Sequence, residues 1–164
     1  MVIDTVVPTH SYQDCTGGLS EAHRQGAETW ALKQTVEILK TEKKAIPTNS
    51  FEKAKRFQRG DFEVILSYEG GAHTKDNVVA WIPERKILFG GCAVKSVEAA
   101  NIGYIKEADM KSWPMMLNQL LEKYSSAELV IPGHGNSGGL ELIQHSIEMV
   151  TDTTSLGLFK KAQE

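Results

Sequence analysis

Four turns of the sequence each follow an apolar run and carry histidine, aspartate or cysteine. They lie at residues 9–18, 70–73, 90–92 and 132–135. Imidazole, carboxylate and thiolate are the ligands that suit zinc, and the glycines in these turns let the backbone turn sharply and leave room for an ion. The candidate metal ligands are His10, Asp14, His73, Cys92 and His134.

An Asp–Cys–His ligand set with an open fourth position would form a catalytic zinc site. Zinc makes its bound water acidic enough to supply hydroxide near neutral pH, so the chemistry implied is metal-assisted hydrolysis. Lys95, three residues after Cys92, could hold an anionic group of the substrate, or it is an ordinary surface lysine. Tyr12, two residues after His10, could add a phenol to the site.

The other histidines and the second cysteine point less clearly to chemistry. His23 and His145 fall on predicted helices, where we expect surface or packing roles. Cys15 either lies near the metal site, beside Asp14, or is a small buried residue. We expect no disulfide, because Cys92 is better explained as a thiolate ligand.

Apolar periodicity predicts strands that alternate with helices, which is typical of an α/β layered fold. Strands are expected at 2–7, 27–31, 57–68 with a turn at 59–61, 77–82, 86–89 and 128–131. Helices are expected at 17–25, 35–43, 111–124 and 140–150, and residues 47–50 are expected to form a loop. The ends of the strands gather the candidate ligands at one edge.

Composition indicates one ordinary globular domain. The chain has 164 residues, of which 41% are hydrophobic and 24% charged, and its formal net charge is -3. Basic residues are scattered, so no nucleic-acid partner is expected. No apolar run approaches membrane-spanning length and no signal peptide is recognised, so the sequence as it stands predicts a cytoplasmic protein. We place the domain at residues 1–150 and a C-terminal tail at 151–164.

Four motifs are specific enough to indicate a family. They are D-C-T-G-G at 14–18, G-A-H-T-K-D-N-V-V at 71–79, W-I-P-E-R-K-I-L-F-G-G-C at 81–92 and P-G-H-G at 132–135. With them the chain resembles the metallo-β-lactamase superfamily from about residue 2 to residue 150. Cysteine at position 92 makes it similar to subclass B1, since hydrolases elsewhere in the superfamily commonly carry aspartate there.

The resemblance implies an αββα sandwich with zinc at one edge and β-lactam amide hydrolysis as the activity. It implies a three-histidine zinc site containing His10 and His73, and a second site formed by Asp14, Cys92 and His134. Asp14 is thereby the candidate catalytic residue as well as a ligand. Lys95 matches the lysine that receives the substrate carboxylate, and Asn101 matches an asparagine near the lactam carbonyl. The resembling family is periplasmic.

Two departures from the family pattern change these expectations. The family motif is H-x-H-x-D, and Tyr12 stands where the middle histidine belongs. We therefore expect a weakened three-histidine site and one zinc per chain rather than two. The family's N-terminal half, with part of its sheet and a substrate loop, precedes this motif and is missing here. We expect the C-terminal portion of the sandwich to be completed by self-association, most simply as a symmetric dimer.

Two hypotheses about function remain open. The first is a zinc-dependent hydrolase that cleaves β-lactams or a related ester or amide, weakened by the changes above. The second is a non-catalytic, oligomeric, zinc-binding relative of the same fold. In both, the expected partners are a small molecule and further copies of the chain.

Overall fold

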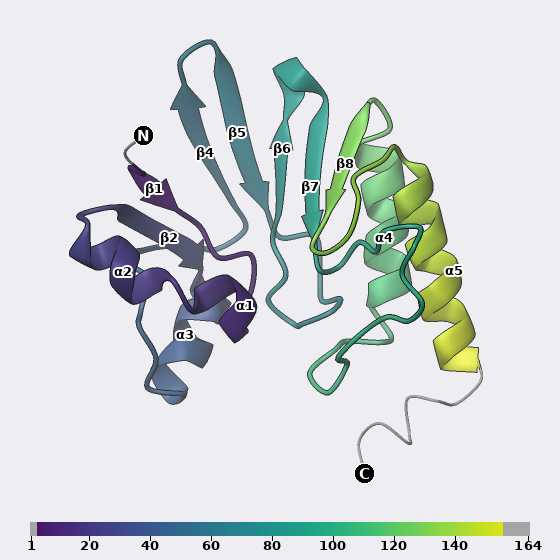
Figure 1. The fold of residues 1–164 in the computed structure, drawn as a ribbon, viewed down its shortest axis with the longest axis horizontal. Helices are drawn as coiled ribbons and strands as arrows, with labels where there is room; N and C mark the ends of the chain where they lie inside the picture. Colours follow the sequence, from purple (N-terminus) through teal and green to yellow (C-terminus); the bar gives the residue numbers. More distant parts are fainter. Residues whose placement is uncertain (1–2, 156–164) are drawn as a thin grey trace.

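Two β-sheets form the centre of the molecule, and helices cover the outer face of each (Figure 1). This computed structural model describes residues 3–155 of the chain. The smaller sheet comes from the first third of the chain, and the larger sheet follows it. The arrangement is the αββα sandwich predicted from the sequence, and that prediction is confirmed.

The smaller sheet is entirely parallel, with strand order β1-β2-β3. Its strands are β1 (Thr5–Val6), β2 (Glu28–Leu32) and β3 (Asn49–Phe51). Parallel neighbours need crossover connections, and helices supply them. These helices are α1 (Gln13–Thr16), α2 (Leu19–Arg24) and α3 (Lys33–Thr41). Gly26, with φ of +77°, lies just past α2, where the sequence predicted a helix stop.

The larger sheet has the order β4-β5-β6-β7-β8 and is antiparallel except for the pair β7–β8. Its strands are β4 (Ala54–Arg59), β5 (Phe62–Ser67), β6 (Val79–Ile82), β7 (Ile87–Gly91) and β8 (Leu129–Pro132). A short 3₁₀ turn, η1 (Pro83–Arg85), joins β6 to β7. Helix α4 (Trp113–Lys123) connects the parallel pair, and α5 (Glu141–Ser155) ends the described chain beside it (Figure 1).

Two apolar cores hold the layers together. Leu32, Phe51, Leu66 and Val78 are buried between the two sheets. A larger cluster lies between the five-stranded sheet and its helices, where Trp113 has no exposed surface. Burying each such side chain contributes about 1.5–3 kcal/mol of transfer free energy. This second core therefore fixes the strands of the larger sheet and the positions of their ends.

Most predicted elements are present with shifted ends. Two elements were not predicted. Helix α1 forms within the expected turn at residues 9–18, and β3 forms where residues 47–50 were expected to be a loop, with Asn49–Phe51 pairing with Trp30–Leu32. Polar turn-forming residues hide this strand, and only the buried side chain of Phe51 indicates it. Helix α5 extends to Ser155, beyond the predicted domain boundary at residue 150. Residue 2 of the first predicted strand and residues 156–164 of the predicted tail lie outside the described residues.

Among residues 3–155, each helix is too short or too polar to cross a lipid bilayer. The two cysteines are free, as the sequence predicted.

Candidate metal centre

Loops that follow four strands meet at one edge of the sandwich. The loop after β1 carries His10, helix α1 carries Asp14, and the loop between β5 and β6 carries His73. Cys92 follows β7 directly, and His134 follows the neighbouring strand β8. All five predicted ligands therefore come together, although up to 124 positions separate them in the sequence.

Asp14, Cys92 and His134 form one close group of ligand atoms. Asp14 Oδ2 lies 3.7 Å from Cys92 Sγ and 3.8 Å from His134 Nε2, and the sulfur lies 3.5 Å from that nitrogen. Zinc bonds of about 2.0–2.3 Å in a tetrahedron place ligand atoms roughly 3.3–3.8 Å apart. The three separations match that geometry, so these residues fit a zinc ion. His134 is 75% exposed, which leaves the group open on the solvent side.

His10 and His73 lie deeper than the Asp–Cys–His group. Their rings are 5.4 Å apart, and their exposed fractions are only 0% and 6%. Within residues 3–155, His10 Nε2 and His73 Nδ1 are buried without a hydrogen-bond partner. His10 Nε2 faces Asp14 Oδ1 at 3.5 Å, too long for an ordinary hydrogen bond. Orphaned buried nitrogens of this kind fit a site built for a cation.

Tyr12 lies against both buried histidines. Its ring centroid is 5.3 Å from that of His10 and 5.5 Å from that of His73, in edge-on contacts, and Tyr104 packs on its other side at 5.6 Å. Burial, and then the carboxylate of Glu107, raise the pKa of Tyr12 above its ordinary value. The phenol is therefore neutral near pH 7 and is a poor metal ligand compared with a histidine.

Burial sets the protonation of the metal-free centre. It lowers the pKa of His73 to about 3, with Lys95 adding to the effect. It also raises the pKa of the Cys92 thiol to about 12, reinforced by Cys15 and Asp14. Burial likewise lowers the pKa of His10, so its contact with Asp14 joins a neutral ring to a carboxylate. The imidazoles thus keep a lone pair for a metal, whereas Cys92 must release a proton to bind one.

The position of Cys92 depends on glycines around it. Gly91 has φ of +58°, a left-handed conformation that glycine adopts without strain, and it turns the chain out of β7. The Gly133 N–H donates to the Gly91 carbonyl oxygen over 2.8 Å. A Cβ on Gly133 would lie 2.5 Å from Cys92 Sγ and 2.6 Å from the Cys92 nitrogen. Only a glycine lets these two backbones approach so closely.

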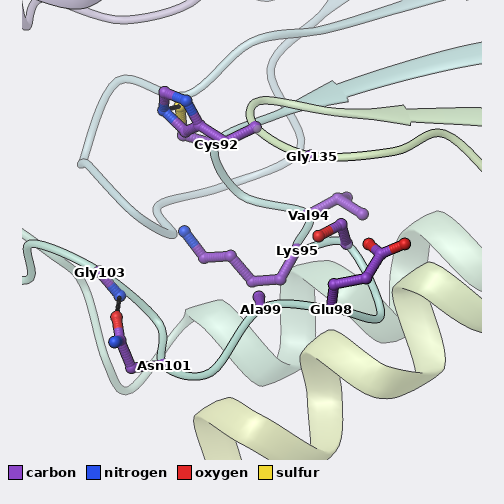
Figure 2. A pocket seen from close by; sticks show the side chains of 10 residues that line it. Cys92, Val94, Lys95, Glu98, Ala99, Asn101, Gly103 and Gly135 are labelled. Atoms are coloured by element: carbon purple, nitrogen blue, oxygen red, sulfur yellow. Dashed lines mark hydrogen bonds between the residues drawn. The ribbon is translucent and has the colours of Figure 1, made fainter.

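Two cavities open onto the centre. One of about 250 Å³ is lined by the ligand side chains with Tyr12 and Tyr104, and one of about 350 Å³ extends from Cys92 towards Asn101. Lys95 lines both cavities, and its side chain reaches across the second (Figure 2). Its Nζ lies 5.4 Å above the Trp113 ring, and burial lowers its pKa.

In the same view, the Lys95 side chain lies between Cys92 and Asn101 (Figure 2). The Asn101 Oδ1 accepts a hydrogen bond from the Gly103 N–H over 2.9 Å, which orients the amide. Both predicted substrate-binding residues thus line the cavity beside the candidate ligands.

Sequence reasoning missed Asp76, which supports the centre, and left open whether Cys15 lies beside it. Asp76 is fully buried and accepts a 2.8 Å hydrogen bond from Thr35 Oγ1, which ties the His73 loop to α3. The Cys15 sulfur lies 3.2 Å from His10 Nδ1 and 3.4 Å from Thr9 Oγ1, so Cys15 belongs beside the site. The place of Asp76 in the motif at residues 71–79, which also carries His73, was the available signal for it.

The chain is similar to several metallo-β-lactamases. It is 37% identical over 148 residues to the metallo-β-lactamase type 2 of Bacteroides fragilis, and 41% identical over 145 residues to metallo-β-lactamase IND-1 of Chryseobacterium indologenes. Among solved structures, the metallo-β-lactamase from Pontibacter korlensis superimposes with a TM-score of 0.88 at 36% identity, covering 91% of this chain and 69% of that one. VMB-1 gives a TM-score of 0.88 at 32% identity, over 94% and 70%. No protein-family model matches.

With this fold, this edge of the sandwich and these relatives, the chain belongs to the metallo-β-lactamase family. The resemblance to subclass B1 is confirmed. The matched segments are 90% and 88% of this chain but only 59% and 61% of the two curated relatives. The activity of the whole relatives is therefore a proposal for this chain.

Replacing Gly133 with alanine should disturb the metal centre, because the new Cβ would overlap Cys92. We expect Gly133→Ala to lose about 1–3 kcal/mol of stability and roughly 10-fold or more in zinc affinity. Chemical denaturation and competition with a zinc chelator measure the two effects. Gly18→Ala is the matched control, since Gly18 has φ of -86° and open space within 4 Å of the added Cβ. Equal zinc affinities in the two variants would contradict the packing argument.

The metal-free protein should lose stability as pH falls from about 6.5 towards 3. His73 has a pKa of about 3 in the fold and an ordinary value of 6.5, so the unfolded chain binds more protons throughout that window. Thermal denaturation in a chelator at several pH values measures the slope. His73→Gln cannot take up this proton, so its melting temperature should fall less steeply between pH 7 and pH 4. Parallel slopes would show that His73 is not the group responsible.

Proposed function

We propose that this chain is a zinc-dependent hydrolase of the metallo-β-lactamase type, acting on the amide of a β-lactam or on a related ester or amide. The observation that carries the proposal is the spacing of Asp14, Cys92 and His134, whose ligand atoms are 3.5–3.8 Å apart before any ion is considered. The relatives' names describe β-lactamases, which supports the substrate class.

We propose one zinc ion per chain, held by Asp14, Cys92 and His134. When bound, zinc supplies an acidic water and stabilises negative charge on the leaving group. The exposed face of His134 leaves the site accessible to a substrate, and the buried Cys92 sulfur closes it from behind. Asp14 is central to the site because its two oxygens face both His134 and the buried His10.

The cavity residues would bind and orient the substrate. The Lys95 ammonium has no carboxylate partner among residues 3–155, so it is available for an anionic group such as a lactam carboxylate. Burial weakens the hydration of this ammonium and strengthens its attraction for an anion. Asn101, with its oxygen held by Gly103, would direct its amide N–H towards the carbonyl being attacked.

Low activity follows from the residue at position 12. Tyr12 occupies the place beside His10 and His73 where a third histidine would complete a second site, and its neutral phenol does not replace that ligand. The same observation favours the alternative function, a non-catalytic relative that binds zinc. The two differ in turnover and not in metal content.

The zinc content of the purified protein is the first test of the proposed function. Elemental analysis of purified protein should give about one zinc per chain, and Cys92→Ser should lower zinc affinity by roughly 100-fold or more, since loss of a supporting residue alone lowers affinity 10–100-fold. Hydrolysis of a chromogenic β-lactam by the zinc-loaded protein then separates the enzyme from the non-catalytic alternative. Protein that remains free of zinc in excess metal would refute both.

Tyr12→His tests whether the missing ligand limits activity. The restored imidazole should raise both the zinc stoichiometry and the rate of β-lactam hydrolysis. Tyr12→Phe, which removes only the hydroxyl, is the matched control and should leave the stoichiometry unchanged. If Tyr12→His changes neither quantity, the loss of the third histidine is not what limits the protein.

We also propose that the chain self-associates through the region of β1. Within the described chain, β1 pairs with β2 on one side only, and Ile3 beside it is 53% exposed. Cavities of about 260 and 180 Å³ flank this strand, one against α2 and one against the β4–β5 hairpin, and apolar side chains line part of each beside charged ones. A free strand edge with partly apolar cavities beside it suits pairing with a second copy of the same strand.

Light scattering coupled to size-exclusion chromatography should show a dimer that dissociates on dilution. Ile3→Glu places a charge on the proposed contact and should weaken the dimer by roughly 10-fold or more, since burying an unpaired charge is strongly unfavourable. Ile46→Glu changes another exposed isoleucine outside both cavities and should leave the dimer intact. A monomer at every concentration would exclude the contact.

A further inference from the structure

We propose that the Cys92 thiolate serves two metal positions, the outer one with Asp14 and His134 and an inner one with His10 and His73. In the inner position, the thiolate replaces the middle histidine of the family motif, whose place Tyr12 occupies. The inference rests on the proposed zinc binding and assigns its ligands in more detail.

The inner set is defined by geometry and burial. One ligand atom from each of His10, His73 and Cys92 lies within 4.8 Å of the others, and all three residues are buried. The largest separation allowed by that limit exceeds the spacing in tetrahedral zinc by only about 1 Å, a gap that small side-chain rotations can close. Within residues 3–155, His10 Nε2 and His73 Nδ1 are among the buried nitrogens without a hydrogen-bond partner, so this part of the centre has unused ligand capacity.

The sheet places Cys92 where it can serve both sets. It follows β7, which lies between β6, the strand that begins after His73, and β8, the strand that precedes His134. A Cβ on Gly133 would lie 2.5 Å from Cys92 Sγ, so the glycine is what leaves room for the sulfur at this point. A thiolate at this point can face the buried histidines or the exposed His134.

Tyr12 closes the third corner of the inner set to other ligands. Its ring packs edge-on against both histidine rings, and Tyr104 covers it from outside. Zinc in proteins is bound by thiolate, imidazole and carboxylate, and the thiolate of Cys92 is the group of that kind within reach of both histidines in the described chain. The substitution thus redirects the inner position to a His–His–Cys set.

The shared thiolate makes the two positions compete. An ion in the outer position withdraws the sulfur from the inner set, and an ion in the inner position withdraws it from Asp14 and His134. Removing an outer ligand should therefore move the ion inward and should not abolish binding. Without the inner set, removing His134 would leave only two ligands and binding would fail.

Cobalt(II) titration distinguishes these outcomes, because a cobalt–thiolate bond gives a charge-transfer band in the near ultraviolet and binding is read without activity. We expect His134→Ala to bind one cobalt ion with that band, at an affinity lowered by no more than about 100-fold. The double variant His134→Ala/His73→Ala should lose both the ion and the band. His134→Ala/His145→Ala is the matched control, since His145 on α5 is outside the centre, and it should behave like His134→Ala alone.

The possible failures are separable. If wild-type protein binds no cobalt, the proposed zinc-dependent function fails before the inner set is tested. If wild-type protein binds cobalt with the thiolate band but His134→Ala does not, zinc binding stands and the inner set is refuted. His134 is 75% exposed, so its replacement by alanine should leave the fold intact, and circular dichroism checks this. His10→Gln in the His134→Ala background repeats the test at the other inner ligand and should also abolish the band.

Discussion

The close approach of two backbones at the ends of β7 and β8 is the constraint on which the metal centre depends. Gly133 N–H donates to the Gly91 oxygen, and the glycine leaves the Cys92 sulfur between His134 and the buried histidines. The parallel pairing of β7 with β8 sets this distance, and the large core under α4 and α5 holds the pair. The backbone contact at Gly133, and not the ligands themselves, therefore links the metal centre to the fold.

Burial prepares the centre for a cation in two opposite ways. It keeps His10 and His73 neutral, so their nitrogens remain available, but it also holds the Cys92 thiol in its protonated form. Only a metal, or a similar concentrated positive charge, offsets the unfavourable burial of the thiolate. The buried polar groups of the metal-free centre are consequently unfavourable for folding. Metal binding and folding stability are therefore coupled.

The loss of one histidine has effects beyond the loss of one ligand. Tyr12 keeps the volume of an aromatic ring and packs against both His10 and His73, so the local structure is retained. The Tyr12 phenol cannot bind a metal as an imidazole does at neutral pH, because burial raises the pKa of the phenol and keeps it protonated. The remaining ligands then form two sets that both contain Cys92, one with His10 and His73 and one with Asp14 and His134.

The sequence by itself determined the family, the αββα class and the identity of the candidate ligands, because ligand types at successive strand ends and the glycines beside them are local features. Strand β3 escaped prediction because its polar residues become a strand only through pairing with β2. The sequence also did not reveal the roles of Asp76 and Cys15, since these depend on Thr35 and His10. Only the tertiary structure decided which ligands lie within coordination distance of one another, because that depends on strand order and on the backbone approach at Gly133. It likewise decided that Cys92 can belong to two sets, a relation between residues 82 and 42 positions away from it that no local pattern encodes.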